Sequence, residues 1–212
     1  MTTSRVSRLL RQNRDWAAET EAARPGFFKT LAAQQRPGLL WIGCADSRVP
    51  ADRITGLEPG EVFVHRNVAN LVHPADSNVL TVISFAVDVL KVTDIVVCGH
   101  YGCGGVQAVL EGGRLDMLTD WLWPLRTTAR VHQQRLQHLD DVARFRRMCE
   151  LNVIEQVVNV SDTSVVRKAW AEGRELSVHG WVYGLENGLL HDLGISAASH
   201  DELQQRYAEV IV

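Results

Sequence analysis

The sequence lacks the features that mark secreted, membrane-spanning or nucleic-acid-binding proteins. Its 212 residues include only 4 cysteines, too few for a disulfide framework, and nothing near the N-terminus resembles the apolar core of a secretory signal. The longest mostly apolar stretch, residues 79–92, is too short to cross a membrane as a helix. The 22 lysines and arginines are outnumbered by 25 acidic residues, so no net basic charge favours nucleic acid or anionic lipid. We therefore expect a cytoplasmic protein that acts on a small molecule, with no nucleic-acid or membrane partner.

The chain does contain enough apolar material for one folded domain. Hydrophobic residues make up 46% and charged residues 22% of the sequence, values that are ordinary for a globular protein. At about 150 residues per domain, this length favours a single domain, which we expect to span residues 1–212. Leu9, Leu10 and Trp16 fall on one side of a helix, so we expect residues 1–25 to form an N-terminal helical arm.

Short β-rich runs alternate with helical patterns along the chain, which is typical of βαβ units. Residues 39–43 and 95–99 are almost continuously apolar, which indicates strands buried on both faces of a parallel sheet. Apolar residues recur at helical spacing over residues 79–90 and 151–158. We therefore predict an α/β fold in which α-helices flank a mostly parallel β-sheet. The predicted strands are residues 39–43, 62–65, 95–99 and 176–182.

Metal-binding residue types follow two of the predicted strands. Cys44 comes directly after residues 39–43, and His100 and Cys103 follow residues 95–99. Because the carboxyl ends of parallel strands meet at one edge of a sheet, we expect these three side chains to lie together. Two thiolates and one imidazole suit zinc, whose catalytic sites use three protein ligands and keep a fourth position open. Each residue alone fits packing equally well, but the three together favour a metal site.

The two remaining cysteines and a cluster of glycines do not by themselves indicate a functional site. Cys98 lies inside an apolar strand pattern and Cys149 inside a helical pattern, so we assign both thiols to packing. Gly102, Gly104 and Gly105 form a cluster, but they have neither the spacing of a dinucleotide-binding turn nor a P-loop lysine. The sequence therefore argues against a nucleotide site.

Asp46 and Arg48 place a carboxylate and a guanidinium beside the first candidate ligand, Cys44. The carboxylate could coordinate the metal, which would close the site, or accept a hydrogen bond from the metal's water, which would leave the site catalytic. The planar guanidinium can hold the carboxylate through two hydrogen bonds. Standing alone, this segment would be read as a polar turn entering a helix.

Two segments around these candidate ligands resemble the β-class carbonic anhydrases. Residues 44–49 (CADSRV) and 100–105 (HYGCGG) are similar to the paired zinc signature of that family, with alanine at Ala45 where serine is more common. The resemblance covers about residues 26–193. Its further matching segments are residues 60–72, 149–153 and 179–184.

The resemblance implies a lyase that interconverts carbon dioxide and bicarbonate with one zinc ion per subunit. Cys44, His100 and Cys103 would be the permanent ligands, and Asp46, held by Arg48, would accept a hydrogen bond from the zinc-bound hydroxide that attacks carbon dioxide. The resemblance also implies a homodimer or homotetramer, in which the N-terminal arm packs on a partner subunit.

The family pattern also assigns a substrate pocket. Gln35 matches a glutamine that reaches across the dimer interface to substrate, Phe63, Val68 and Val89 match apolar walls, and Gly104 lies beside the metal. Such a pocket suits carbon dioxide, which has no net charge. Without the resemblance, the three apolar residues would be read as ordinary core.

One branch of the family, bacterial and regulated by bicarbonate, provides a more specific resemblance. Trp41, Arg66 and Tyr183 match the residues that surround a second, non-catalytic bicarbonate in that branch. There, bicarbonate or low pH favours a closed state in which the aspartate, here Asp46, takes the fourth zinc position. The branch often has glutamate where this chain has Asp52, a candidate partner for Arg66; otherwise Trp41 and Tyr183 would simply pack.

Three other functions compete with carbonic anhydrase. A structural zinc protein would normally supply four cysteine or histidine ligands and would need neither Asp46 nor Arg48. A redox protein using Cys44 and Cys103 would not require zinc. A related zinc hydrolase acting on carbonyl sulfide or carbon disulfide is the strongest alternative, because its metal site would look alike.

Overall fold

A computed structural model of the chain describes residues 5–112 and 116–211. The chain forms two compact units, Met1–Gln35 and Arg36–Val212. The N-terminal unit contains helices α1 (Arg5–Ala23) and α2 (Phe27–Ala33). Within it, the rings of Trp16 and Phe28 meet edge to face with 5.6 Å between their centroids. Packing of this unit on a partner subunit stays a prediction.

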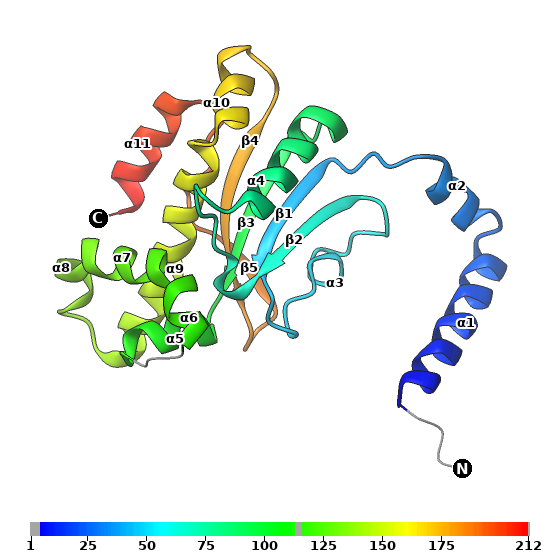
Figure 1. The fold of residues 1–212 in the computed structure, drawn as a ribbon, viewed down its shortest axis with the longest axis horizontal. Helices are drawn as coiled ribbons and strands as arrows, with labels where there is room; N and C mark the ends of the chain where they lie inside the picture. Colours follow the sequence, from blue (N-terminus) through cyan, green and yellow to red (C-terminus); the bar gives the residue numbers. More distant parts are fainter. Residues whose placement is uncertain (1–4, 113–115, 212) are drawn as a thin grey trace. The chain divides into compact units, whose positions relative to one another are not determined.

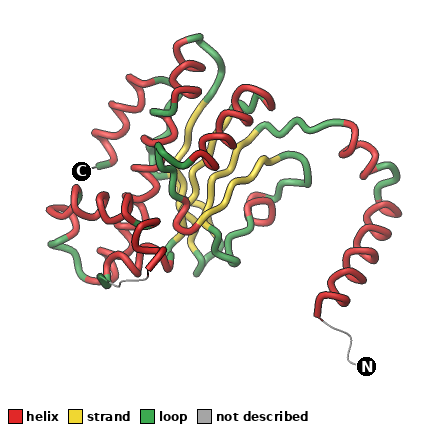
Figure 2. Tube along the Cα trace, viewed as in Figure 1, coloured by secondary structure: helices red, strands yellow, loops and turns green. Residues whose placement is uncertain are grey.

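The main unit is built on a five-stranded sheet with the order β2-β1-β3-β4-β5 (Figures 1 and 2). The pairs β1–β2, β1–β3 and β3–β4 are parallel, and β5 is antiparallel to β4. The four predicted strands are confirmed, whereas β5 was not expected. The strands are β1 (Leu39–Cys44), β2 (Val62–Asn67), β3 (Asp94–His100), β4 (Ser177–Gly184) and β5 (Leu189–Asp192).

The sheet order explains why two strands are apolar along nearly their whole length. β1 and β3 are flanked by other strands on both sides, and every residue after the first is buried in each. Since β1, β2 and β3 are parallel, their carboxyl ends share one edge of the sheet. This edge carries Cys44 at the end of β1, Asn67 in register with it at the end of β2, and His100 at the end of β3.

Helices cover one face of the sheet and enclose the larger hydrophobic core. Helix α9 crosses β3 and β4, and helices α5 and α7 pack against α9 in turn (Figure 1). No helix within the described residues is both long and apolar enough to span a membrane. The helices of the main unit are α3 (Ala51–Thr55), α4 (Ser77–Ser84), α5 (Gly104–Leu110), α6 (Asp116–Trp121), α7 (Trp123–Val131), α8 (Gln133–Leu136), α9 (Asp141–Ser161), α10 (Ser164–Ala171) and α11 (His200–Val210).

Side-chain caps fix where several of these helices begin. Asp76 accepts a hydrogen bond from the Asn78 amide at the start of α4, and Asp140 accepts one from the Ala143 amide at the start of α9. The predicted helical stretch over residues 79–90 is confirmed in place, but its second half, Phe85–Leu90, is a π-helix. This wider turn is a local irregularity that apolar spacing does not reveal.

The other face of the sheet holds a smaller buried cluster. It contains Trp41 of β1, Val96 and Cys98 of β3, and Ala51 of α3. The Trp41 ring contacts the ring of Trp181, with 6.4 Å between centroids. Cys98 is therefore a packing residue, as predicted, although it lies in the strand that ends at His100.

The contact between β4 and α9 depends on Gly180. A Cβ atom at this position would collide with Ile195 and lie 3.0 Å from Cγ2 of Val157. We expect Gly180→Ala to lower the free energy of unfolding by about 1–3 kcal/mol through overpacking. Denaturant unfolding would measure the loss, with Gly38→Ala as the control because an added Cβ there meets nothing within 4 Å. Equal stability of the two variants would contradict this packing.

Candidate metal centre

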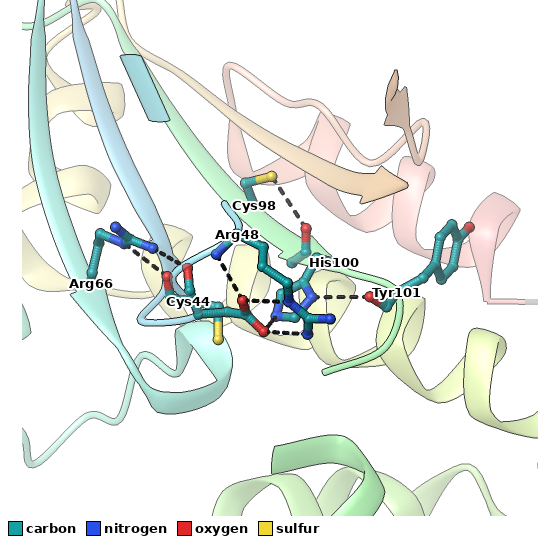
Figure 3. Close-up of polar contacts among 8 residues, drawn as sticks. Cys44, Arg48, Arg66, Cys98, His100 and Tyr101 are labelled. Atoms are coloured by element: carbon teal, nitrogen blue, oxygen red, sulfur yellow. Dashed lines mark hydrogen bonds and ion pairs between the residues drawn. The ribbon is translucent and has the colours of Figure 1, made fainter. Parts of the chain in front are cut away.

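Three side chains converge at the carboxyl edge of the sheet, and Figure 3 shows two of them, Cys44 and His100. Cys44 ends β1, His100 ends β3, and Cys103 directly precedes the first residue of α5. Their ligand atoms all lie within 4.8 Å of one another, and all three residues are buried. The turn from His100 to Cys103 passes through Gly102, whose positive φ of 74° allows the chain to fold back sharply. The structure therefore brings together the three residues that the sequence predicts as metal ligands.

The His100 ring is oriented by the residue that follows it. Its Nδ1 donates to the main-chain carbonyl of Tyr101 at 3.0 Å. The other ring nitrogen, Nε2, is then the one whose electron pair is free to bind a metal. That Nε2 is buried and has no nitrogen or oxygen hydrogen-bond partner among the described residues; its polar neighbours are the Cys44 sulfur and the Asp46 carboxylate. A buried imidazole nitrogen without a partner is costly, and a metal ion among the three residues would satisfy it.

The two thiols form a coupled pair. The Cys103 thiol donates to the Cys44 sulfur and lowers the pKa of Cys44 to about 4, while burial acts in the opposite direction. The same contact, together with burial, raises the pKa of Cys103. Burial lowers the pKa of His100, but the Cys44 sulfur, the Tyr101 carbonyl and the Asp46 carboxylate together raise it above its ordinary value. The cluster thus already stabilises one thiolate, and a bound cation would replace the proton that the two sulfurs share.

Asp46 and Arg48 form the expected pair beside this cluster. Arg48 donates from Nε to Asp46 Oδ1 at 2.9 Å and from Nη2 to Oδ2 at 2.7 Å. The main-chain amide of Arg48 also donates to Oδ1 at 2.9 Å. These bonds hold the pKa of Asp46 well below its usual range, so the carboxylate stays ionised and acts only as an acceptor. Its Oδ2 lies 3.7 Å from Nε2 of His100.

Arg66 braces the backbone of the site. Its Nε donates to the carbonyl of Cys44 at 2.9 Å, and its Nη2 donates to the carbonyl of Asp46 (Figure 3). The described residues form no ion pair between Arg66 and Asp52, its candidate partner. The guanidinium is instead committed to main-chain oxygens, because β2 places Arg66 in register with Gly43, directly before Cys44.

Residues expected to form the substrate pocket differ in how far they are exposed and in what they contact. An added Cβ at Gly104 would meet nothing within 4 Å, so space is open beside Cys103. Phe63 contacts Phe85 with 5.8 Å between ring centroids. Val68 and Val89 are exposed by 39% and 61%, so these two are not ordinary core. Gln35 is exposed as well and belongs to the N-terminal unit, so its role toward substrate stays a prediction.

Trp41, Arg66 and Tyr183 share one face of the sheet. Register places Trp41 beside Val64, two residues before Arg66, and Tyr183 beside His100. The indole Nε1 of Trp41 is buried, has no hydrogen-bond partner among the described residues, and lies over Gly43, where an added Cβ would collide with it. The three residues thus share one face of the sheet, and their role toward bicarbonate stays a prediction.

Tyr101 is a contributor to the site that the sequence analysis missed. Besides accepting from His100, it donates from its hydroxyl to Glu150 Oε1 at 2.8 Å, and the Arg146 guanidinium stacks 3.8 Å from its ring centre. Burial and Glu150 raise its pKa to about 12, so the phenol stays protonated. The one sequence feature that could have predicted this contact with α9 is the position of Tyr101 between the two candidate ligands His100 and Cys103.

The donor set fits zinc. Two sulfurs and one imidazole nitrogen, all within reach of one ion, match the soft and intermediate ligands that zinc prefers. Three protein ligands would leave a fourth position open on zinc, and the ionised Asp46 carboxylate lies 3.7 Å from the Nε2 of one of them, His100. A fully structural zinc site, with four cysteine or histidine ligands, is not formed by the described residues.

Comparison with known proteins identifies relatives of one kind. A family model described as carbonic anhydrase matches residues 39–190. A carbonic anhydrase of Emericella nidulans is 50% identical over 189 residues, covering 89% of this chain and 83% of the relative. A carbonic anhydrase of Pseudomonas aeruginosa is 39% identical over 194 residues, covering 86% of this chain and 87% of the relative. Because fungal and bacterial proteins both match, these relatives do not assign the chain to the bacterial branch.

Solved structures agree with the sequence relatives. A Coccomyxa β-carbonic anhydrase in complex with acetazolamide superposes with a TM-score of 0.90 at 38% identity, covering 96% of this chain and 92% of the other. A tetrameric β-carbonic anhydrase from Sordaria macrospora superposes with a TM-score of 0.86 at 41% identity, covering 89% of this chain and 96% of the other.

Proposed function

The chain belongs to the β-class carbonic anhydrase family, and from this we propose that it hydrates carbon dioxide reversibly at one zinc ion held by Cys44, His100 and Cys103. The observation that carries the proposal is the convergence of these three ligand atoms within 4.8 Å beside an ionised carboxylate. A redox role for the two thiols would not require a buried imidazole nitrogen this close to both sulfurs, with no nitrogen or oxygen partner among the described residues.

When bound, zinc would lower the pKa of a coordinated water and so supply a nucleophile near neutral pH. The residues of the chain then have separate roles. His100 is held in the tautomer that presents Nε2 by its bond to the Tyr101 carbonyl. Asp46, fixed by Arg48 and unable to donate, accepts a hydrogen bond from the attacking oxygen and orients its lone pair toward carbon dioxide. Arg48 keeps that carboxylate from turning onto the metal.

The substrate pocket is completed by a second copy of the chain in this proposal. Open space beside Gly104 and the exposed side chains of Val68 and Val89 provide apolar surface that suits carbon dioxide. Gln35 of the partner subunit would supply a hydrogen bond to substrate. We therefore propose a homodimer or homotetramer, which the tetrameric Sordaria macrospora relative supports. All four cysteines are free thiols, which fits the reducing cytoplasm.

A direct comparison of substrates tests this function against its strongest alternative. The zinc-loaded protein would be assayed with carbon dioxide, carbonyl sulfide and carbon disulfide under one set of conditions. We expect the highest kcat/KM for carbon dioxide. A preference for either sulfur compound would replace the proposed reaction with hydrolysis of that compound at the same site.

Regulation by bicarbonate is the second part of the proposal. Arg66 holds the carbonyls of Cys44 and Asp46, and the Trp41 indole N–H on the same face finds no acceptor within the described part of the chain. A bicarbonate bound by Trp41, Arg66 and Tyr183 would compete for the Arg66 donors and loosen the backbone around Asp46. Asp46 could then turn from Arg48 to the fourth zinc position, and an anion that binds only this closed state would populate it.

Trp41→Phe tests the regulatory site. We expect the wild type to be inhibited by bicarbonate, and its activity to be low near neutral pH and to rise steeply toward alkaline pH, because hydroxide competes with Asp46. The variant loses the indole donor, so bicarbonate inhibition should weaken while zinc content stays the same. Trp170→Phe is the control, because its indole donates to the Leu176 carbonyl, away from the site. A wild-type profile that is flat from about pH 7 to 9, with only product inhibition by bicarbonate, would contradict regulation.

A further inference from the structure

A strained turn lies against the segments that carry the candidate metal ligands. Ala69 and Asn70 both have positive φ, 67° and 50°, although neither is glycine. The left-handed region is unfavourable for residues with a Cβ, most of all for two in succession. Both residues are buried. Their conformation therefore has to be held by the surrounding structure, and we refer to the pair as the left-handed turn.

The left-handed turn touches all three ligand-bearing segments. Ala69 packs on Gly105 in the first turn of α5, where an added Cβ would come within 2.9 Å of the Ala69 Cβ. The Asn70 side chain lies against Gly99, directly before the histidine ligand, with its Oδ1 3.5 Å from an added Cβ there. The main-chain amide of Ala69 also donates toward the sulfur of Cys44. A shift of this turn would disturb the spacing of all three ligands.

Three amide side chains of α9, two of them buried, hold the left-handed turn and the residues that follow it. Asn152 Nδ2 donates to the Ala69 carbonyl at 2.9 Å, and Gln156 Nε2 donates to Asn152 Oδ1 at 3.1 Å. The Val72 amide donates to Gln156 Oε1 at 2.8 Å, and Asn159 Nδ2 donates to the Val72 carbonyl at 3.0 Å. Asn152, Gln156 and Asn159 thus follow one side of the helix and grip the segment that contains the turn; we call them the amide ladder.

The composition of α9 makes this arrangement informative. Asn152 and Gln156 are each only 1% exposed, in a helix whose other buried residues are largely apolar. Burying two amides costs free energy unless their hydrogen bonds are made, and here those bonds go to the turn and to each other. Apolar side chains would pack there without that cost, but they could not hold the Ala69 carbonyl.

We propose that Asn152 is a positioning residue for the zinc site, which acts by holding the Ala69–Asn70 turn between the segments that carry Cys44, His100 and Cys103. This inference rests on the proposed zinc site and adds a part of the chain, α9, that supplies no ligand. Asn152 sets the geometry of the ligands through the turn, and Gln156 holds Asn152.

Zinc affinity, measured by competition with a chromophoric chelator, tests the proposal. We expect Asn152→Ala to weaken zinc binding by about 10–100-fold, the usual cost of losing an outer-shell contact. The absorption spectrum of its cobalt(II) form should also change, since ligand geometry is altered. Val160→Ala is the matched control, because Val160 is equally buried in α9 but lies outside the ladder. It should lower thermal stability while leaving affinity and spectrum as in the wild type.

Further variants separate positioning from a general loss of stability. Gln156→Ala removes the next rung and should shift zinc affinity in the same direction, so the result does not depend on Asn152→Ala folding. Ala69→Gly should restore part of the affinity in the Asn152→Ala protein, because glycine adopts the left-handed region without strain. Wild-type affinity and cobalt spectrum in both ladder variants would overturn the proposal. A wild type that binds no zinc would instead overturn the zinc site itself.

Discussion

Replacing Cys44 with serine is expected to remove most of the bound zinc and, with it, carbon dioxide hydration. Cys44 is the thiol that the cluster already favours as a thiolate, with a pKa lowered to about 4. The loss of zinc affinity should exceed the 10–100-fold typical of outer-shell changes, because a direct ligand is removed. His100→Ala and Cys103→Ser should behave in the same way. Zinc content by metal analysis and hydration by stopped flow measure both effects.

Cys98→Ser is the matched control for the ligand variants. Cys98 is another buried thiol, two residues before His100 near the carboxyl end of β3. Burial raises its pKa, and its Sγ donates to the Gly99 carbonyl at 3.3 Å. A serine hydroxyl can make the same bond, so zinc and activity should be retained. Full zinc occupancy in Cys44→Ser, or zinc loss in Cys98→Ser, would show that the ligand assignment is wrong.

The second large effect is expected for Asp46→Asn. The amide cannot carry the negative charge that Arg48 stabilises, and one of its two polar groups is a donor where the carboxylate only accepts. Zinc should still bind, but hydration should slow by about 100-fold or more if Asp46 handles the proton of the attacking oxygen. Stopped-flow rates on samples of equal zinc content would measure this effect.

Asp52→Asn provides the comparison for Asp46→Asn. Asp52 is an exposed acid in the first turn of α3, six residues further along the chain, and it pairs with neither Arg48 nor Arg66 in the described structure. It should retain nearly normal turnover. Near-normal turnover in Asp46→Asn as well would show that Asp46 takes no part in the reaction.

Much of the fold and the cluster could be predicted because the signals are local. β1 and β3 read as continuous apolar runs since each is buried by strands on both sides and by layers on both faces. Once parallel strands are predicted, the residues after them must share an edge, which brings Cys44 to His100 and Cys103. The Asp46–Arg48 pair is also local, because the two residues are only two positions apart in the chain.

The rest depends on contacts between distant parts of the chain. Strand β5 is short, mostly exposed and antiparallel, so it has no apolar run to reveal it. Arg66 turns to the carbonyls of Cys44 and Asp46 because of the register between β1 and β2, which spacing alone does not give. The amide ladder puts polar side chains on a side of α9 where a helical pattern predicts apolar ones. The partner of Asn152, Ala69, lies 83 residues away in the chain.

Hydration of carbon dioxide as a function of added zinc tests the central claim most directly. Metal-free protein would be titrated with zinc, and the hydration rate followed by stopped flow at each step. If Cys44, His100 and Cys103 hold one catalytic zinc ion, activity should rise from the uncatalysed rate in proportion to zinc and level off at about one equivalent per chain. Full activity without metal, or a zinc-loaded protein no faster than buffer, would contradict the account.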